Sequence, residues 1–112
     1  MNMKQKRVFQ VGFKGKKIIV KNYRICDKFF SKMRGLMLRS KNFNESLLFV
    51  FSKPGIYPIH SFFCRKFIAV WMLNGKITDE KLVLPWKFSV TPKEKFDELL
   101  EIPLSAVGKR NI

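Results

Sequence analysis

The sequence predicts a mainly β fold built from short, mostly antiparallel strands. Apolar residues occur in short runs, several of which alternate with polar residues, and this period of two is typical of strands. Turn dipeptides separate the runs. The strongest of them, Asn74-Gly75, suits a type I′ hairpin because both residues tolerate positive φ. A chain of 112 residues fits one domain, residues 1–112, and is long enough to bury a hydrophobic core.

The N-terminal part of the chain predicts a hairpin followed by a short helix. Arg7–Phe13 is predicted as a strand, Lys14-Gly15 as a turn and Ile18–Cys26 as the return strand, in which apolar residues alternate in part. Asp27 can cap a helix, because apolar residues recur after it at helical spacing and Gly35 supplies a C-terminal stop.

Further strands are predicted in the middle of the chain. Leu47–Phe51 is a continuous apolar run bounded by serines, which indicates a buried strand, and Lys53-Pro54-Gly55 is expected to break it. Ile59–Cys64 is predicted as the next strand. Phe67–Leu73 and Lys76–Leu84 then flank the hairpin turn, and the proline that follows ends the second of them.

The last segment of the chain admits two structures. Thr91–Glu94 fits a capping box with proline at the first helical position, which predicts a helix over Pro92–Leu100. The alternative is a final strand at Phe96–Ile102 that ends at Pro103. A single terminal turn is expected at Ser105–Gly108.

The charge of the chain is large and uneven. The net charge is +15, and the first 43 residues hold thirteen Lys or Arg residues against one acid, Asp27, which leaves +12 there and +3 in the rest. A one-sided basic field attracts polyanions such as RNA or DNA. The alternative is a lysine-rich surface that only keeps a small protein in solution. The candidate polyanion-binding residues are Lys14, Lys16, Lys17, Lys21, Arg24, Arg65 and Lys66.

The two cysteines and the N-terminus bear on metal binding and on compartment. Cys26 and Cys64 are far apart and form no CxxC pair, so we expect both to be reduced and buried. One histidine and two cysteines fall short of the four ligands of a structural zinc, and we expect no metal or cofactor. The basic N-terminus lacks the apolar core of a signal peptide, and no apolar run is long enough to span a membrane. These features predict a cytoplasmic protein.

His60 is the one side chain whose ordinary pKa lies near neutrality. On a strand it would share a face with Cys64, but at a spacing too long for a direct hydrogen bond, and no acid lies nearby in sequence. We therefore expect a structural, hydrogen-bonded histidine, assign no catalytic residue, and do not expect an enzyme. The candidate ligand-binding residues are His60, Arg34, Arg39 and Trp86.

Three stretches resemble a known family of small archaeal and bacterial proteins, domain of unknown function 192. Within Cys26–Arg39, the run Arg34-Gly35-Leu36-Met37 is similar to the family's signature. The stretch from Leu47 to Gly75 follows the family's order of motifs, and Leu82–Trp86 with Leu99–Pro103 resembles its last strands.

The resemblance implies a compact, mostly antiparallel β-barrel or sandwich-like domain with one or two short helices, and it favours a strand at Phe96–Ile102. It brings no catalytic residues, because none are established for the family. This chain departs from the family at Ala69, where an acid is usual, and that acid would be the natural partner for His60. It also lacks the longer C-terminal tail of many bacterial relatives.

The function predicted from these observations is binding of a polyanion, RNA, DNA or an anionic ligand, through the basic first third. Aromatic and basic residues also interleave at Phe62–Phe67 and Trp86–Phe88, a pattern that suits single-stranded nucleic acid. Core packing is the alternative for the phenylalanines, whereas Trp86 is expected on an exposed loop. The alternative hypothesis is a small-molecule or sugar-binding or hydrolytic domain with a pocket near His60.

Overall fold

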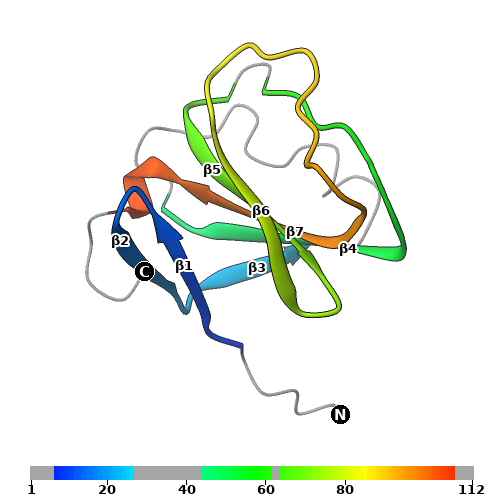
Figure 1. Cartoon of the computed structure of the whole chain (residues 1–112). Coiled ribbons are helices and arrows are strands. Elements are labelled where there is room, and N and C mark those ends of the chain that lie inside the picture. Colours follow the sequence, from blue (N-terminus) through cyan, green and yellow to red (C-terminus); the bar gives the residue numbers. More distant parts are fainter. Residues whose placement is uncertain (1–6, 27–43, 62–63, 108–112) are drawn as a thin grey trace.

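The prediction of a mainly β fold is confirmed. A computed structural model describes residues 7–26, 44–61 and 64–107, which form seven strands and one short 3-10 helix (Figure 1). The elements are β1 (Phe9–Phe13), β2 (Lys16–Val20), β3 (Tyr23–Cys26), β4 (Ser46–Gly55), β5 (Phe67–Leu73), β6 (Lys76–Val83), β7 (Phe96–Pro103) and η1 (Leu104–Ala106). The helix expected after Asp27 lies outside the described residues.

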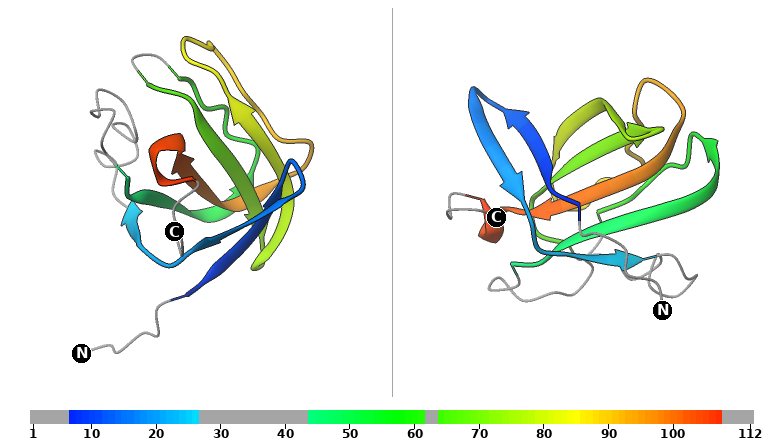
Figure 2. Two further views of the ribbon diagram at one scale, coloured as in Figure 1. Left: turned by 90° about the vertical axis from the view of Figure 1, so that its left-hand side faces the viewer. Right: turned by 90° about the horizontal axis from the view of Figure 1, so that it is seen from below.

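The described strands form two sheets, a two-stranded hairpin and a five-stranded sheet. The hairpin pairs β1 with β2, and the larger sheet has the order β3-β4-β7-β5-β6. All neighbours are antiparallel except β3 and β4, which run parallel. The hairpin leans across one face of the larger sheet, as the two views of Figure 2 show. β7, the last of these strands in sequence, lies at the centre of the sheet. The sheet is therefore complete only when distant parts of the chain come together.

Both predicted hairpin turns are present. Lys14 and Gly15 join β1 to β2 with φ of 52° and 76°, and Asn74 and Gly75 join β5 to β6 with φ of 52° and 83°. Positive φ at both central positions is the hallmark of the type I′ turn, which matches the twist of the strands it connects.

Three sequence-based strand boundaries are wrong. Ile18–Cys26 is two strands, because the chain leaves the hairpin after β2 and β3 joins the larger sheet beside β4. β4 continues through Pro54, which lies beyond the end of β3 and so needs no ladder partner on that side. The described part of Ile59–Cys64 is a loop that makes one β-bridge, from Ile59 to Val90.

The last segment is a strand, and the helix over Pro92–Leu100 is wrong. β7 pairs with β4 on one side and β5 on the other, and it buries side chains on both faces of the sheet. The central position of β7 therefore overrides the local capping signal. The terminal turn is present as η1.

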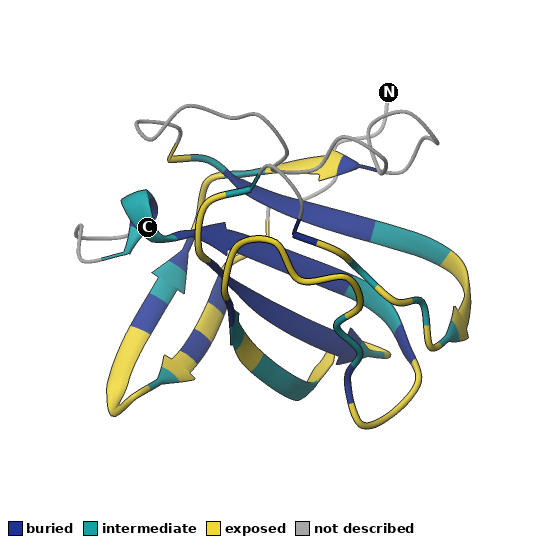
Figure 3. Ribbon diagram, turned by 90° about the horizontal axis from the view of Figure 1, so that it is seen from above, coloured by how far each residue is buried: buried dark blue, intermediate teal, exposed yellow. Residues whose placement is uncertain are grey.

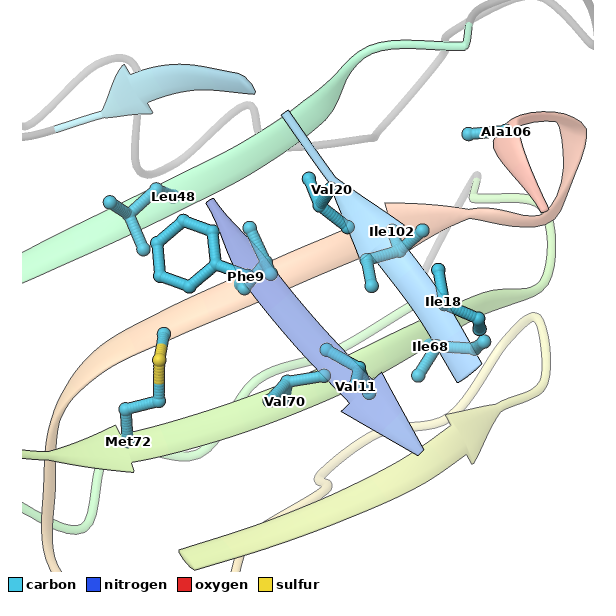
Figure 4. Packing of buried hydrophobic residues seen from close by; sticks show 11 residues of the cluster. Phe9, Val11, Ile18, Val20, Leu48, Ile68, Val70, Met72, Ile102 and Ala106 are labelled. Atoms are coloured by element: carbon cyan, nitrogen blue, oxygen red, sulfur yellow. The ribbon is translucent and has the colours of Figure 1, made fainter. Parts of the chain in front are cut away.

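The five-stranded sheet has a separate hydrophobic core on each face. The hairpin core lies between the hairpin and the sheet, as Figure 4 shows. It consists of Phe9, Val11, Ile18, Val20, Leu48, Ile68, Val70, Met72, Leu100, Ile102 and Ala106. The loop core lies on the opposite face and consists of Cys26, Leu47, Phe49, Phe67, Ala69, Trp71, Val83, Phe96 and Leu99. In Figure 3 the central strands are buried, whereas the loops and the hairpin turn are exposed.

Candidate functional site

Two surfaces of the described structure carry the predicted binding residues, and the first is the β1–β2 hairpin. Its lysines, here called the hairpin lysines, are all exposed. They are Lys14, Lys16, Lys17 and Lys21. Three of them line a shallow depression that runs over residues 10–17 of the hairpin. Nothing in the described part of the chain forms an ion pair with a hairpin lysine.

The two arginines of the same region are already neutralised. The guanidinium of Arg7 donates to both carboxylate oxygens of Glu98, at 2.6 Å and 3.1 Å, and this hydrogen bonding raises the pKa of Arg7. Arg24 contacts Glu45, with nitrogen and oxygen 2.9 Å apart. Arg24 was predicted to bind a polyanion, and its ion pair makes it a weaker candidate than the lysines. The uncompensated charge of residues 7–26 therefore resides in the hairpin lysines.

The second surface is organised by the side chain of Ser61, which is fully buried. Its hydroxyl donates to the carbonyl oxygen of Leu84 at 2.6 Å and accepts the backbone N–H of Lys87 at 2.7 Å. The backbone of Ser61 adds a bond to the carbonyl of Lys87, and its carbonyl accepts the N–H groups of Trp86 and Cys64. Ser61 thus ties the loop after β6 to the loop before β5.

Trp86 occupies an unusual backbone conformation in this loop. It follows Pro85 in a tight turn with φ of 62°, a left-handed value that bulky residues rarely adopt. The hydrogen bonds to Ser61 hold the turn in place. Strain of this kind costs about 1–3 kcal/mol and persists only where the surroundings enforce it. Trp86 is nevertheless 58% exposed, which confirms that it lies on an exposed loop.

Basic and aromatic side chains meet around this turn and define what we call the loop surface. Its members are Arg65, Lys66, Leu84, Trp86, Lys87 and Phe88, all exposed, with Phe88 exposed to 85%. Arg65 follows Cys64, whose N–H shares the carbonyl of Ser61 with that of Trp86. Residues 53–67 and 81–93 contain six Lys or Arg residues and no acid. The loop surface is therefore positively charged, and in Figure 1 it lies at the top of the molecule, away from the hairpin at the left.

His60 lies beside this surface and is exposed. Because its segment is a loop, the expectation that His60 and Cys64 share a strand face is wrong. Cys64 is half-buried, and burial, followed by the charge of Glu101, raises the pKa of its thiol to about 11. Such a thiol is protonated at neutral pH and is a poor nucleophile. Within the described part of the chain, neither Cys26 nor Cys64 forms a disulfide.

Glu101 is a buried acid that the sequence analysis did not single out. It lies on β7 between Leu47 and Ala69 and is only 6% exposed. No hydrogen bond or ion pair reaches its side chain from the described residues, and burial raises the pKa of the carboxyl to about 8. At the position of Ala69 this chain lacks the acid that is usual in the family it resembles, and the register places Glu101 directly across from Ala69. The sequence feature that could have indicated this buried acid is its position as the single acid within the otherwise apolar run Leu99–Pro103.

Two candidate ligand-binding residues, Arg34 and Arg39, lie outside the described residues. No group of three or more potential metal ligands occurs within residues 7–26, 44–61 and 64–107. In the same ranges no helix is long and apolar enough to cross a membrane. Ser61 was missed because its partners are more than twenty residues away in sequence, where local patterns carry no information.

Comparison with known proteins finds similarity to a protein of an uncharacterised family. No family model matches it. It is 34% identical over 92 residues to a UPF0127 protein of Thermococcus sibiricus, an alignment that covers 79% of this chain and 58% of that protein. The chain therefore spans less than two thirds of the length of this relative.

Two solved structures share the fold. A protein of unknown function from Novosphingobium aromaticivorans superposes with a TM-score of 0.68 and 12% identity, over 84% of this chain and 70% of that one. A Sinorhizobium meliloti protein described as a "putative transcription regulator" gives a TM-score of 0.67 and 16% identity, over 86% and 78%. At these identities the likeness concerns the fold alone.

Proposed function

We propose that this protein binds polyanions, with the hairpin lysines as its main electrostatic contact. The observation that carries the proposal is the pairing pattern of residues 7–26. The two arginines are held by Glu98 and Glu45, whereas the hairpin lysines are exposed without an acidic partner among the described residues. We also propose that the chain belongs to the family of domain of unknown function 192. The order of the matching motifs along the chain supports this assignment.

The physical basis is release of counterions. A nucleic acid holds a condensed layer of cations, and each lysine that neutralises a phosphate releases about one of them. A flexible, fully charged lysine at a hairpin turn can follow a phosphate backbone without prior reorganisation of the fold. Binding of this kind does not depend on base sequence, because phosphate contacts carry no base information.

The test is a salt titration of RNA or DNA binding by wild type and by the triple variant Lys14→Glu/Lys16→Glu/Lys17→Glu. At about 50 mM salt the wild type should retard both nucleic acids, and affinity should fall steeply as salt rises. The variant should bind more weakly, with a log–log salt slope shallower by about 2–3 units if each lysine contacts one phosphate.

A matched control separates a site from total charge. Lys76→Glu/Lys95→Glu, set against the double hairpin variant Lys14→Glu/Lys16→Glu, makes the same change in net charge at exposed positions outside the hairpin turn and the loop surface. This control should keep more affinity than the hairpin variant. Equal losses in the two variants, or no retardation of wild type at low salt, would contradict the proposal.

A second candidate function is a small-molecule or sugar-binding or hydrolytic site near His60. One observation favours it: the buried carboxyl of Glu101 has no partner among the described residues and lies close enough to Cys64 to raise its pKa. Native mass spectrometry of the purified protein can detect a retained small molecule. Its loss in both His60→Ala and Glu101→Gln, with polyanion binding intact, would support this candidate.

A further inference from the structure

The loop surface has a property that the hairpin lysines lack: its positive charge is interleaved with exposed aromatic rings. Trp86 and Phe88 flank Lys87 in the loop after β6. Both rings are largely exposed although the protein has a well-formed apolar core on each face of its sheet. Two largely exposed aromatic side chains, two positions apart in sequence, present apolar surface to solvent, and exposed apolar surface commonly marks a binding site.

The backbone conformation of Trp86 is imposed by the fold. Its backbone is held in the left-handed region because the N–H groups of Trp86 and Lys87 donate to the buried Ser61, although a glycine would satisfy the same turn at lower cost. Tryptophan at this position presents a large side chain to solvent from a backbone that is held by hydrogen bonds. A backbone ordered in advance lowers the entropy that is lost when a ligand stacks on the ring.

We propose that the loop surface binds single-stranded nucleic acid. Trp86 and Phe88 stack on unpaired bases, while Lys87 and the neighbouring Arg65 and Lys66 contact phosphates. The inference rests on the proposed polyanion binding and names its partner class, because exposed rings can stack on unpaired bases but not on bases already stacked in a duplex. The absence of any acid from residues 53–67 and 81–93 supplies the charge complementarity.

The test uses the exposed ring as its own reporter. The chain has two tryptophans, and Trp71 is fully buried in the loop core, so quenching by a ligand reports on Trp86. The probe is an oligothymidylate of about 12 nucleotides, a length suited to one small domain. Its duplex with oligoadenylate, heparin, and vesicles of phosphatidylserine and phosphatidylcholine serve as comparisons.

The decisive variant is Trp86→Gly. Because φ of 62° suits glycine, this change removes the ring while it relieves backbone strain, and the melting temperature should stay the same or rise. Affinity for the single strand should fall about tenfold or more, as expected for loss of one stacked base. Affinity for the duplex and for heparin should not change, and Trp86→Phe should retain most of the single-strand affinity.

The outcomes are separable from those of the polyanion proposal. Equal affinity for single strand and duplex, or an unchanged single-strand affinity in Trp86→Gly, overturns this inference and leaves polyanion binding intact. Quenching or a blue shift with vesicles but not with the oligonucleotide overturns it in favour of a lipid surface. If neither nucleic acid nor heparin binds at low salt, both proposals fail together.

Discussion

The two faces of the five-stranded sheet are covered in different ways and bury different chemistry. On one face the hairpin packs strand against sheet over the apolar residues of the hairpin core. On the other face loops cover the sheet, and the loop face buries the carboxyl of Glu101, a half-buried thiol and the indole N–H of Trp71, which has no hydrogen-bond partner among the described residues. The hydroxyl of Ser46 is a buried polar group on the hairpin face, because Ser46 lies two positions before Leu48 on β4 and shares its face.

This difference places a regular, strand-packed face and a less regular, loop-covered face on one small sheet. Strands that pack on a sheet leave no room for ionisable groups, because their regular side chains fill the layer. Loops are less regular and can enclose such groups while they present other side chains to solvent. The loop face is therefore where a binding surface can be modified without loss of the apolar layer beneath the hairpin.

The largest effect that would sharpen the comparison is the ionisation of Glu101. Its pKa is about 8 in the folded protein and 4.5 ordinarily, so between these values the folded chain binds more protons than the unfolded chain. The free energy of unfolding should therefore fall as pH rises from about 4.5 to 8, by several kcal/mol at about 1.4 kcal/mol per pKa unit. The pKa of Cys64, at about 11, places that thiol outside this window.

Urea unfolding at several pH values measures the effect. Glu101→Gln cannot ionise, so the difference in stability between variant and wild type isolates this one carboxyl. The variant should gain on wild type steadily above pH 4.5 and the gain should level off above about pH 8. Glu94→Gln, at an exposed position, is the control and should follow wild type throughout. A constant difference between Glu101→Gln and wild type would show that Glu101 is already ionised in the fold.

The next effect compares the two cores directly. Leu99 and Leu100 are neighbours on β7, both buried, and they point to opposite faces of the sheet. Leu100→Ala leaves a cavity beneath the hairpin, where strands on both sides limit collapse, whereas Leu99→Ala leaves one beneath loops that can relax. Each should cost about 2–5 kcal/mol, with Leu100→Ala the more costly because residual cavity volume adds to the lost transfer energy. Chemical denaturation of both variants provides the comparison, and a larger loss for Leu99→Ala would reverse it.

The sequence predicts features set by neighbouring residues better than features set by distant ones, for a physical reason. Period-two patterning and the turns at Lys14-Gly15 and Asn74-Gly75 depend on residues that are close in sequence, and these are the features that the structure confirms. Strand patterning could not show that β3 leaves the hairpin for the larger sheet, because alternation does not specify the partner strand. The capping box before β7 was misleading because the strand's central position outweighs a local helix signal.

At the candidate site, too, features set by neighbouring residues were predictable, whereas contacts between distant residues were not. Exposure of Trp86 follows from its position after Pro85, which marks a turn, and the basic residues were visible as charge. Their neutralisation was not visible, since Arg7 and Arg24 meet acids that come from other strands. The role of Ser61 depends on contacts with Leu84 and Lys87, which only the folded chain brings together.

The smallest effect concerns that serine and the loop surface it supports. In Ser61→Ala the carbonyl of Leu84 and the N–H of Lys87 lose their partner, while the backbone bonds of residue 61 remain. An unsatisfied buried group costs about 1–3 kcal/mol, so the loss should be at the lower end of that range because the loop can admit water. Ser89→Ala, at an exposed position in the same loop, is the matched control and should stay within about 0.5 kcal/mol of wild type.

The readout that decides this prediction is local. If Ser61 holds the loop surface, Ser61→Ala should raise the hydrogen-exchange rates of the Trp86 and Lys87 amides far more than those of β1 and β2. Single-strand affinity should fall with them, because a mobile Trp86 must be ordered on binding. An increase in exchange spread evenly over both faces would mean that Ser61 stabilises the whole sheet, and the separation of a stable hairpin face from an adaptable loop face would not hold.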